Sequence, residues 1–126
     1  MSTKRILIVD DEPDIREVVQ VSLETVSGWQ VITAESGDEG IAKAKQEKPD
    51  AILLDAMMPN MDGPAAFQKL QADPSTKQIP VIMFTAKVQQ ADRKKFADIG
   101  VKEIITKPFD PMKLGSQIAA ILGWSV

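Results

Sequence analysis

Ile6-Leu7-Ile8-Val9-Asp10-Asp11 is the stretch that decides the fold, because an unbroken apolar run ends directly in two carboxylates. Continuous runs of Val, Ile and Leu are typical of buried parallel strands, which are covered on both faces. Three more runs are followed by polar side chains in a similar way. They are Ala51–Leu54 before Asp55, Val81–Phe84 before Thr85, and Ile104–Ile105 shortly before Lys107. Open α/β sheets carry their functional groups at the carboxyl ends of the strands, so we expect these side chains to converge on one edge.

Helical patterns alternate with the strand-like runs. The first extends from Pro13 to about Gly28, with apolar residues three and four positions apart. We expect five of its residues to face the core: Ile15, Val18, Val19, Leu23 and Val26. Four further helices are predicted after Ser36 (a capping box with Glu39), after Gly63, from Gln89 to Ile99, and from Pro111 with Asp110 as its cap. The helix from Gln89 to Ile99 is very polar, so we expect it to be the least firmly held.

Including Gln30–Ala34, five strands alternate with five helices. This alternation favours an α/β fold, a doubly wound five-stranded parallel sheet with helices on both faces, because parallel neighbours need crossover connections. The flavodoxin-like strand order 2-1-3-4-5 fits five strands. It makes the strands that end at Asp10 and Asp55 neighbours, and it places Thr85 and Lys107 on the next two.

Composition narrows the possible functions. The chain has 126 residues, a net charge of −3, and no cysteine or histidine. We expect a single domain over residues 1–126 with no output domain. The charge gives no basic surface for direct nucleic-acid binding, and the missing residue types exclude disulfides, thiol nucleophiles and a typical zinc site. The apolar run near the start is too short for a signal peptide or a membrane span, so we expect a cytoplasmic protein without membrane insertion.

Three carboxylates should meet at the point where the strand order reverses. Asp10, Asp11 and Asp55 cannot share that space at pH 7 without neutralisation. Ligand sets of oxygen alone suit a hard cation, and a site with few protein ligands suits Mg²⁺ better than Ca²⁺.

Four motifs of the chain together resemble those of a known family. They are Val9-Asp10-Asp11-Glu12, Leu54-Asp55-Ala56-Met57-Met58-Pro59 with Met61-Asp62-Gly63, Phe84-Thr85-Ala86, and Thr106-Lys107-Pro108-Phe109. In order and placement they look like the motif set of the receiver domain of two-component response regulators, the CheY-like family. The resemblance spans essentially the whole chain.

The resemblance implies a phosphoacceptor signalling protein rather than an enzyme. Asp55 would accept a phosphoryl group from a histidine kinase, a phosphotransfer protein or a small acyl phosphate, and the protein would also dephosphorylate itself. Thr85 and Lys107 would bind phosphoryl oxygens. Mg²⁺ would be held by Asp10, Asp11 and Asp55 with the backbone carbonyl of Met57. The protein would then act as a diffusible output module or as a phosphorelay intermediate.

The chain departs from the family pattern at Ile104, where many receivers carry Tyr or Phe. We therefore expect phosphorylation to be read out as movement of the polar helix from Gln89 to Ile99. The surface that changes would include Lys87, Lys95 and Ile104, and would bind a downstream protein. The family also predicts a cis peptide bond between Lys107 and Pro108.

Two other readings stay open. One is an interaction module with the same fold that signals without phosphorylation, which the absence of an aromatic residue at 104 favours mildly. The other is a Mg²⁺-dependent aspartyl-phosphate phosphatase of the haloacid dehalogenase type. That class needs a second Asp two residues after its nucleophile on the first strand, and Asp10-Asp11-Glu12-Pro13 lacks this spacing.

Overall fold

The computed structural model describes residues 3–86 and 90–124. They form one parallel sheet with the strand order β2-β1-β3-β4-β5, as the sequence predicts. The strands are β1 (Arg5–Val9), β2 (Gln30–Ala34), β3 (Ala51–Leu54), β4 (Val81–Thr85) and β5 (Glu103–Thr106). The helices are α1 (Pro13–Val26), α2 (Gly37–Glu47), α3 (Gly63–Ala72), α4 (Gln90–Ile99) and α5 (Leu114–Leu122).

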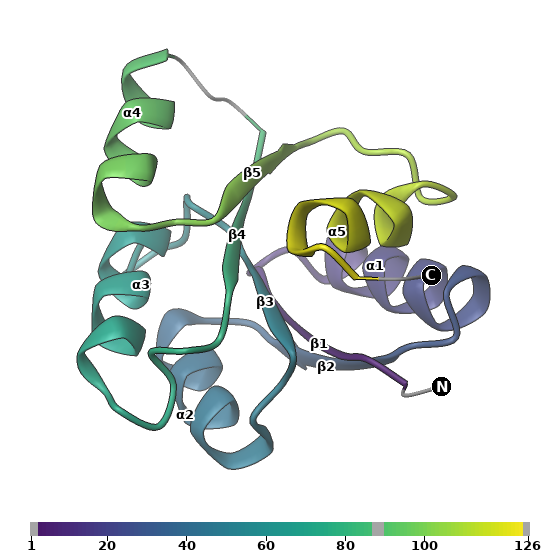
Figure 1. Cartoon of the computed structure of the whole chain (residues 1–126), viewed down its shortest axis with the longest axis horizontal. Coiled ribbons are helices and arrows are strands. Elements are labelled where there is room, and N and C mark those ends of the chain that lie inside the picture. Colours follow the sequence, from purple (N-terminus) through teal and green to yellow (C-terminus); the bar gives the residue numbers. More distant parts are fainter. Residues whose placement is uncertain (1–2, 87–89, 125–126) are drawn as a thin grey trace.

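Helices cover both faces of the sheet (Figure 1). Alternate strand residues point to opposite faces, so Leu7 and Val9 pack with α2, α3 and α4, whereas Ile6 and Ile8 pack with α1 and α5. Because both faces are covered, the central strands are apolar over most of their length: Ile6–Val9 of β1, all of β3, and residues 81–84 of β4. The arrangement leaves the carboxyl ends of the strands as the place where polar groups gather. None of the helices in the described ranges combines the length and the apolar character that a bilayer span requires.

The capping box predicted for α2 is present with one difference. The Ser36 hydroxyl accepts a hydrogen bond from the Glu39 N–H at 3.1 Å. The Glu39 carboxylate, however, accepts from the N–H of Glu35 at 2.7 Å, one residue earlier than the usual pattern.

The last helix begins later than the sequence predicts. Asp110 does not cap α5; its carboxylate accepts the N–H of Met112 at 2.9 Å in a separate turn, and α5 starts only at Leu114. A groove of about 350 Å³ lies between this turn and α1, and Pro111 and Met112 line it on the side of the turn.

The same groove explains two wrong core predictions in α1. Val18 is 41% exposed and Val26 is 45% exposed, whereas Val19 and Leu23 are buried as expected. Val18 lies about 100° around the helix from Val19. Both exposed valines border the groove rather than the sheet.

Candidate functional site

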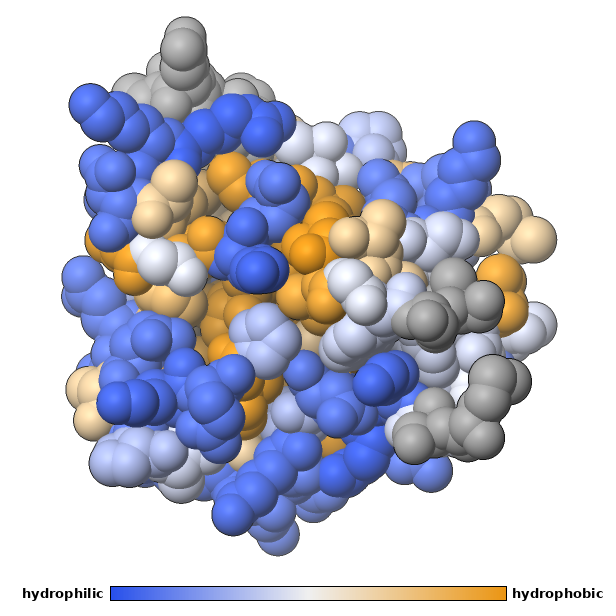
Figure 2. Space-filling view, in the orientation of Figure 1, coloured by the Kyte–Doolittle hydropathy of each residue, from blue (hydrophilic) through white to orange (hydrophobic). Residues whose placement is uncertain are grey.

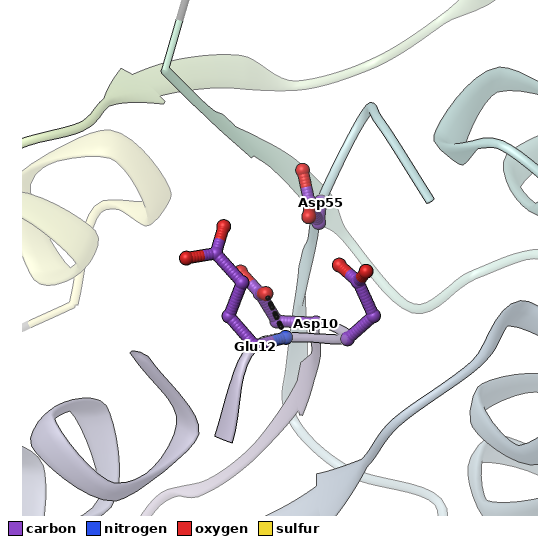
Figure 3. Close-up of side chains that lie close together, drawn as sticks. Asp10, Glu12 and Asp55 are labelled. Carbon is purple, nitrogen blue, oxygen red and sulfur yellow. Dashed lines mark hydrogen bonds between the residues drawn. The ribbon is translucent and has the colours of Figure 1, made fainter. Parts of the chain in front are cut away.

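The ends of β1 and β3 bring two buried carboxylates together. Val9 and Leu54 are partners in the parallel ladder, and the N–H of Asp55 donates to the carbonyl of Val9 at 2.9 Å. Asp10 and Asp55 follow directly and point into the same space (Figure 3). Asp55 is only 3% exposed. The predicted meeting of these strand ends is therefore present.

Two further carboxylates join the pair. Among the described residues, one carboxylate oxygen each from Asp10, Asp11, Glu12 and Asp55 lies within 4.8 Å of the others. Asp11 and Glu12 are exposed, while Asp10 and Asp55 are buried. Glu12 was not predicted as a site residue, although its place directly after Asp11 could have suggested it.

Backbone hydrogen bonds fix the two buried carboxylates. The N–H of Glu12 donates to Asp10 Oδ1 at 2.9 Å, and the N–H of Met57 donates to Asp55 Oδ1 at 3.0 Å. Each contact joins a carboxylate to the residue two positions later, which is an Asx turn. The second turn places the backbone of Met57 beside Asp55, while the Met57 side chain is exposed.

Gly63, at the start of α3, packs against the backbone of the segment that carries Asp55. Its N–H donates to the carbonyl of Ala56 at 3.0 Å. A Cβ at this position would lie 2.7 Å from the carbonyl oxygen of Asp55, closer than real Cβ contacts. Glycine therefore allows the start of α3 to pack directly on the backbone that carries Asp55.

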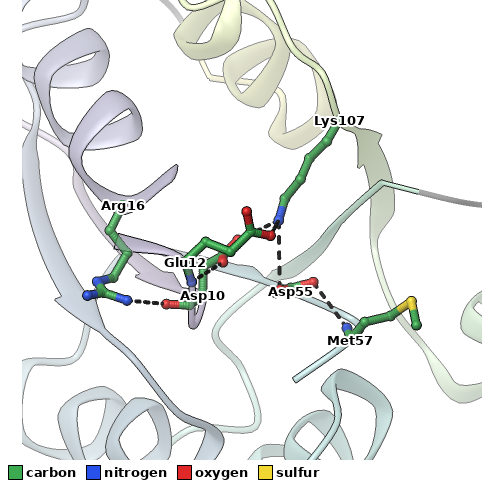
Figure 4. Close-up of polar contacts among 6 residues, drawn as sticks. All are labelled: Asp10, Glu12, Arg16, Asp55, Met57 and Lys107. Atoms are coloured by element: carbon green, nitrogen blue, oxygen red, sulfur yellow. Dashed lines mark hydrogen bonds and ion pairs between the residues drawn. The ribbon is translucent and has the colours of Figure 1, made fainter. Parts of the chain in front are cut away.

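Lys107 enters the cluster from the end of β5 (Figure 4). Its Nζ lies 2.6 Å from Asp10 Oδ2, 3.7 Å from Asp55 Oδ2 and 3.7 Å from Glu12 Oε1, and its side chain is largely buried. The Lys107-Pro108 peptide bond is cis, as predicted. The N–H of Lys107 donates to the carbonyl of Thr85 at 2.8 Å, so Thr85 lies beside it at the end of β4 with its side chain buried.

The electrostatics of the site act most strongly on Asp55. Burial raises the pKa of Asp55 to about 6, and the charges of Asp10 and Asp11 add to this, while the Met57 N–H and Lys107 oppose it. Burial lowers the pKa of the Lys107 ammonium, but its bond to Asp10 and the nearby carboxylates outweigh that effect and raise the pKa above its usual value. Lys107 therefore stays charged near neutral pH. Asp55 is mostly ionised there too, but its negative charge destabilises the folded protein.

The donor set fits a hard divalent cation. The clustered ligand atoms are carboxylate oxygens, and the chain contains no histidine or cysteine. The four carboxylates can carry more negative charge than the single Lys107 ammonium neutralises. An oxygen-only, partly exposed site of this kind suits Mg²⁺ with several waters.

Two residues of the predicted partner surface lie on α4 and β5. Lys95 is exposed on α4, and Ile104 is half-buried on β5. Lys87 lies outside the described residues. Arg16, which contacts the backbone of Asp10, was not predicted to take part in the site.

Residues 6–119 match the model of the response regulator receiver domain. The protein PilH of Pseudomonas aeruginosa is 42% identical over 118 residues, which cover 94% of this chain and 97% of PilH. The chain spans about half the length of other curated relatives, which are transcriptional regulators 40% identical to it.

Two solved structures share the fold. The chemotaxis protein CheY4 of Vibrio cholerae superposes with a TM-score of 0.89 at 28% identity, covering 95% of this chain and 99% of CheY4. The receiver domain of the sensor histidine kinase PA1611 of Pseudomonas aeruginosa has a TM-score of 0.85 at 28% identity, covering 97% of this chain and 99% of that domain. The latter structure is described with a magnesium ion coordinated in its active site cleft.

Proposed function

Because the chain belongs to the response regulator receiver domain family, we propose that it accepts a phosphoryl group on Asp55 from a histidine kinase or a phosphotransfer protein, in a Mg²⁺-dependent reaction. The phosphorylated protein then signals by altered binding to another protein. The observation that supports this most is the place of Asp55: buried, beside Asp10, and 3.7 Å from the ammonium of Lys107.

The chemistry needs positioning and neutralisation more than covalent machinery. An Asp55 carboxylate oxygen attacks phosphorus in line with the leaving group. A phosphorus–oxygen bond to Asp55 forms as the phosphorus–nitrogen bond of phosphohistidine, or the phosphorus–oxygen bond of an acyl phosphate, breaks. The leaving imidazole takes up a proton, whereas a carboxylate leaves as the anion. The reaction yields an acyl phosphate on Asp55.

Lys107 and Thr85 provide the other contacts. The Lys107 ammonium lies closer to Asp10 than to Asp55. When another positive charge neutralises the Asp10 carboxylate, the Lys107 ammonium is free to bind one phosphoryl oxygen. The Thr85 hydroxyl donates a hydrogen bond to a second phosphoryl oxygen. Asp10, Asp11, Asp55 and the carbonyl of Met57 would hold Mg²⁺, which supplies positive charge to the developing phosphoryl oxygens.

The target surface is proposed on the side of α4 and β5. Lys95 is exposed on α4 and Ile104 is partly exposed on the edge strand β5. Figure 2 shows apolar surface gathered between α4 and α5, in the region of β5, with hydrophilic surface around it. A protein partner suits this surface better than nucleic acid, because the chain carries a net charge of −3. PilH matches the chain over 97% of its own length, so a receiver domain also forms nearly the whole of a relative.

The test is exposure of the purified protein to acetyl phosphate with and without Mg²⁺, followed by intact-mass measurement. We expect a single phosphoryl adduct that needs Mg²⁺ and is absent from Asp55→Asn. Asp38→Asn, the same change at an exposed position at the start of α2, should be labelled like the parent. An unlabelled parent protein would favour a phosphorylation-independent interaction module. Catalytic release of phosphate over many turnovers would favour the phosphatase reading.

A further inference from the structure

Arg16 contacts the acidic cluster from outside. Its Nη1 donates to the backbone carbonyl of Asp10 at 2.7 Å, from the side of Asp10 away from Lys107 (Figure 4). The side chain is 18% exposed, and its Nη2 lies 3.7 Å from the carboxylate of Glu35, which is exposed. The guanidinium thus spans the loop after β1 and the loop after β2.

The Asp10 carbonyl is the remaining polar group of a tightly held residue. The N–H of Asp10 donates to the carbonyl of Ala34 at 3.1 Å, and its two carboxylate oxygens accept from the Glu12 N–H and from Lys107. With the Arg16 bond, the N–H, the carbonyl and both carboxylate oxygens of Asp10 have a hydrogen-bond partner. The direction of its side chain is therefore strongly determined.

The same bond restricts the next residue. The carbonyl of Asp10 and the N–H of Asp11 belong to one planar peptide group, so holding the oxygen limits rotation of the whole plane. Within the described residues, no hydrogen bond holds the exposed Asp11 carboxylate. By fixing the orientation of the Asp10-Asp11 peptide, Arg16 therefore restricts the position of the Asp11 backbone and with it the positions that the Asp11 carboxylate can reach.

We infer that Arg16 is a positioning residue for the cation site: by binding the Asp10 carbonyl it holds the Asp10 and Asp11 carboxylates in the arrangement that binds Mg²⁺. The inference rests on the proposed function, because it takes the acidic cluster to be a Mg²⁺ site. Replacing a group that orients metal ligands typically lowers metal affinity by roughly 10- to 100-fold.

Charge and positioning predict opposite effects when Arg16 is removed. A positive charge beside carboxylates repels a cation, so loss of the charge alone would strengthen Mg²⁺ binding. Loss of the carbonyl bond would free the Asp10-Asp11 peptide and weaken binding. The sign of the change therefore distinguishes the two roles.

The experiment is a calorimetric Mg²⁺ titration of the full chain in the absence of any phosphoryl donor. Arg16→Met keeps the apolar stem and removes both donors and charge; we expect Mg²⁺ affinity to fall about 10-fold. Arg16→Lys keeps the charge with a single donor and should lose less. Glu35→Gln, which breaks the ion pair but leaves the Asp10 bond, should bind within about 2-fold of the parent, because exposed pairs contribute little.

A second readout is the Mg²⁺ dependence of labelling by acetyl phosphate. For Arg16→Met we expect a shift to higher Mg²⁺ concentration with a near-parental rate at saturation. Unchanged or tighter Mg²⁺ binding in Arg16→Met would overturn the inference while leaving the proposed function intact. A parent protein that binds no Mg²⁺ would overturn both. If Arg16→Met does not fold, Arg16→Lys decides, and parental affinity in that variant counts against the inference.

Discussion

At Asp55 the protein keeps a charge in a place where ionisation is unfavourable. The side chain is buried beside Asp10, and Lys107, its ion-pair partner among the described residues, lies 2.6 Å from Asp10 but 3.7 Å from Asp55. The pKa of Asp55 is accordingly raised from 3.8 to about 6. Negative charge at this position is only partly compensated, which favours either a proton or a cation nearby.

The raised pKa predicts how stability changes with pH. Above about pH 6 Asp55 is ionised in both the folded and the unfolded chain, and its charge destabilises the fold by at most about 3 kcal/mol. As the pH falls from about 6 toward 4, the folded protein takes up the proton first and the penalty disappears. We expect Asp55→Asn, which removes the charge, to raise the free energy of unfolding by about 1–2 kcal/mol at pH 7.5 without metal.

The measurement is urea unfolding in EDTA at a series of pH values. The gain from Asp55→Asn should shrink toward zero between pH 6 and pH 4, and Asp38→Asn should give no comparable trend. A gain that does not depend on pH, or a loss of stability at pH 7.5, would contradict the assignment of the raised pKa to Asp55.

Helix α1 has two apolar faces with different environments. One face, represented by Val19, is fully buried against the sheet and α5. The other includes Val21, which is 55% exposed and lines the groove beside Pro111 and Met112. Apolar residues on this helix therefore do not all stabilise the fold equally.

We expect Val19→Ala to lower the free energy of unfolding by about 1.5–3 kcal/mol, because it removes two buried methyl groups and leaves a cavity. Val21→Ala, the same chemical change at the groove, should cost less than about 0.5 kcal/mol. Chemical unfolding of both variants under one set of conditions measures the difference. Equal losses would show that the groove closes in solution.

The strands were predictable from sequence because their environment imposes a simple pattern. Both faces are covered along Ile6–Val9 of β1 and along β3, so these residues are all apolar and the polar residue that follows marks the edge of the sheet. That pattern, with the strand order 2-1-3-4-5, was sufficient to place Asp10 and Asp55 side by side. The same pattern placed Lys107 at this edge, whereas its role and its cis bond were predicted from the family resemblance.

Helix faces and contacts between loops were harder to predict. Periodicity in α1 gives apolar positions but not which of two apolar stripes meets the sheet, and Val18 and Val26 line the groove instead. The contact of Arg16 with the Asp10 carbonyl joins α1 to the loop after β1. Neither feature has a signature in a single sequence, since both arise from tertiary packing.

At the scale of the whole molecule, we propose that the end of β4 links Asp55 to the target surface. Thr85 is buried there, beside the backbone of Lys107, and the chain continues from Ala86 toward α4. Within its described residues, α4 is anchored mainly by the buried Phe96 and the partly buried Ile99. Displacing an element with so few apolar contacts requires little free energy.

We expect phosphorylation to draw the Thr85 hydroxyl toward the cleft and to change the position or order of α4. A conformational shift of this kind requires that the phosphoryl group interact differently with the two states, and the Thr85 contact provides that difference. Ile104 is too small to signal by exposing or hiding a ring, so the backbone should report the change. Hydrogen exchange of the full chain with Mg²⁺, with and without beryllofluoride, should therefore show altered protection from Ala86 to Gly100.

Thr85→Val is the matched control, because it removes the hydroxyl with little change in side-chain volume. In this variant beryllofluoride should still protect the segment after Asp55, whereas the response of α4 should be much smaller. Asp55→Asn should show neither response. If protection changes in the parent protein are confined to the segment after Asp55, with none between Ala86 and Gly100, α4 is not the element that carries the signal. If the α4 response is undiminished in Thr85→Val, the coupling does not pass through the Thr85 hydroxyl.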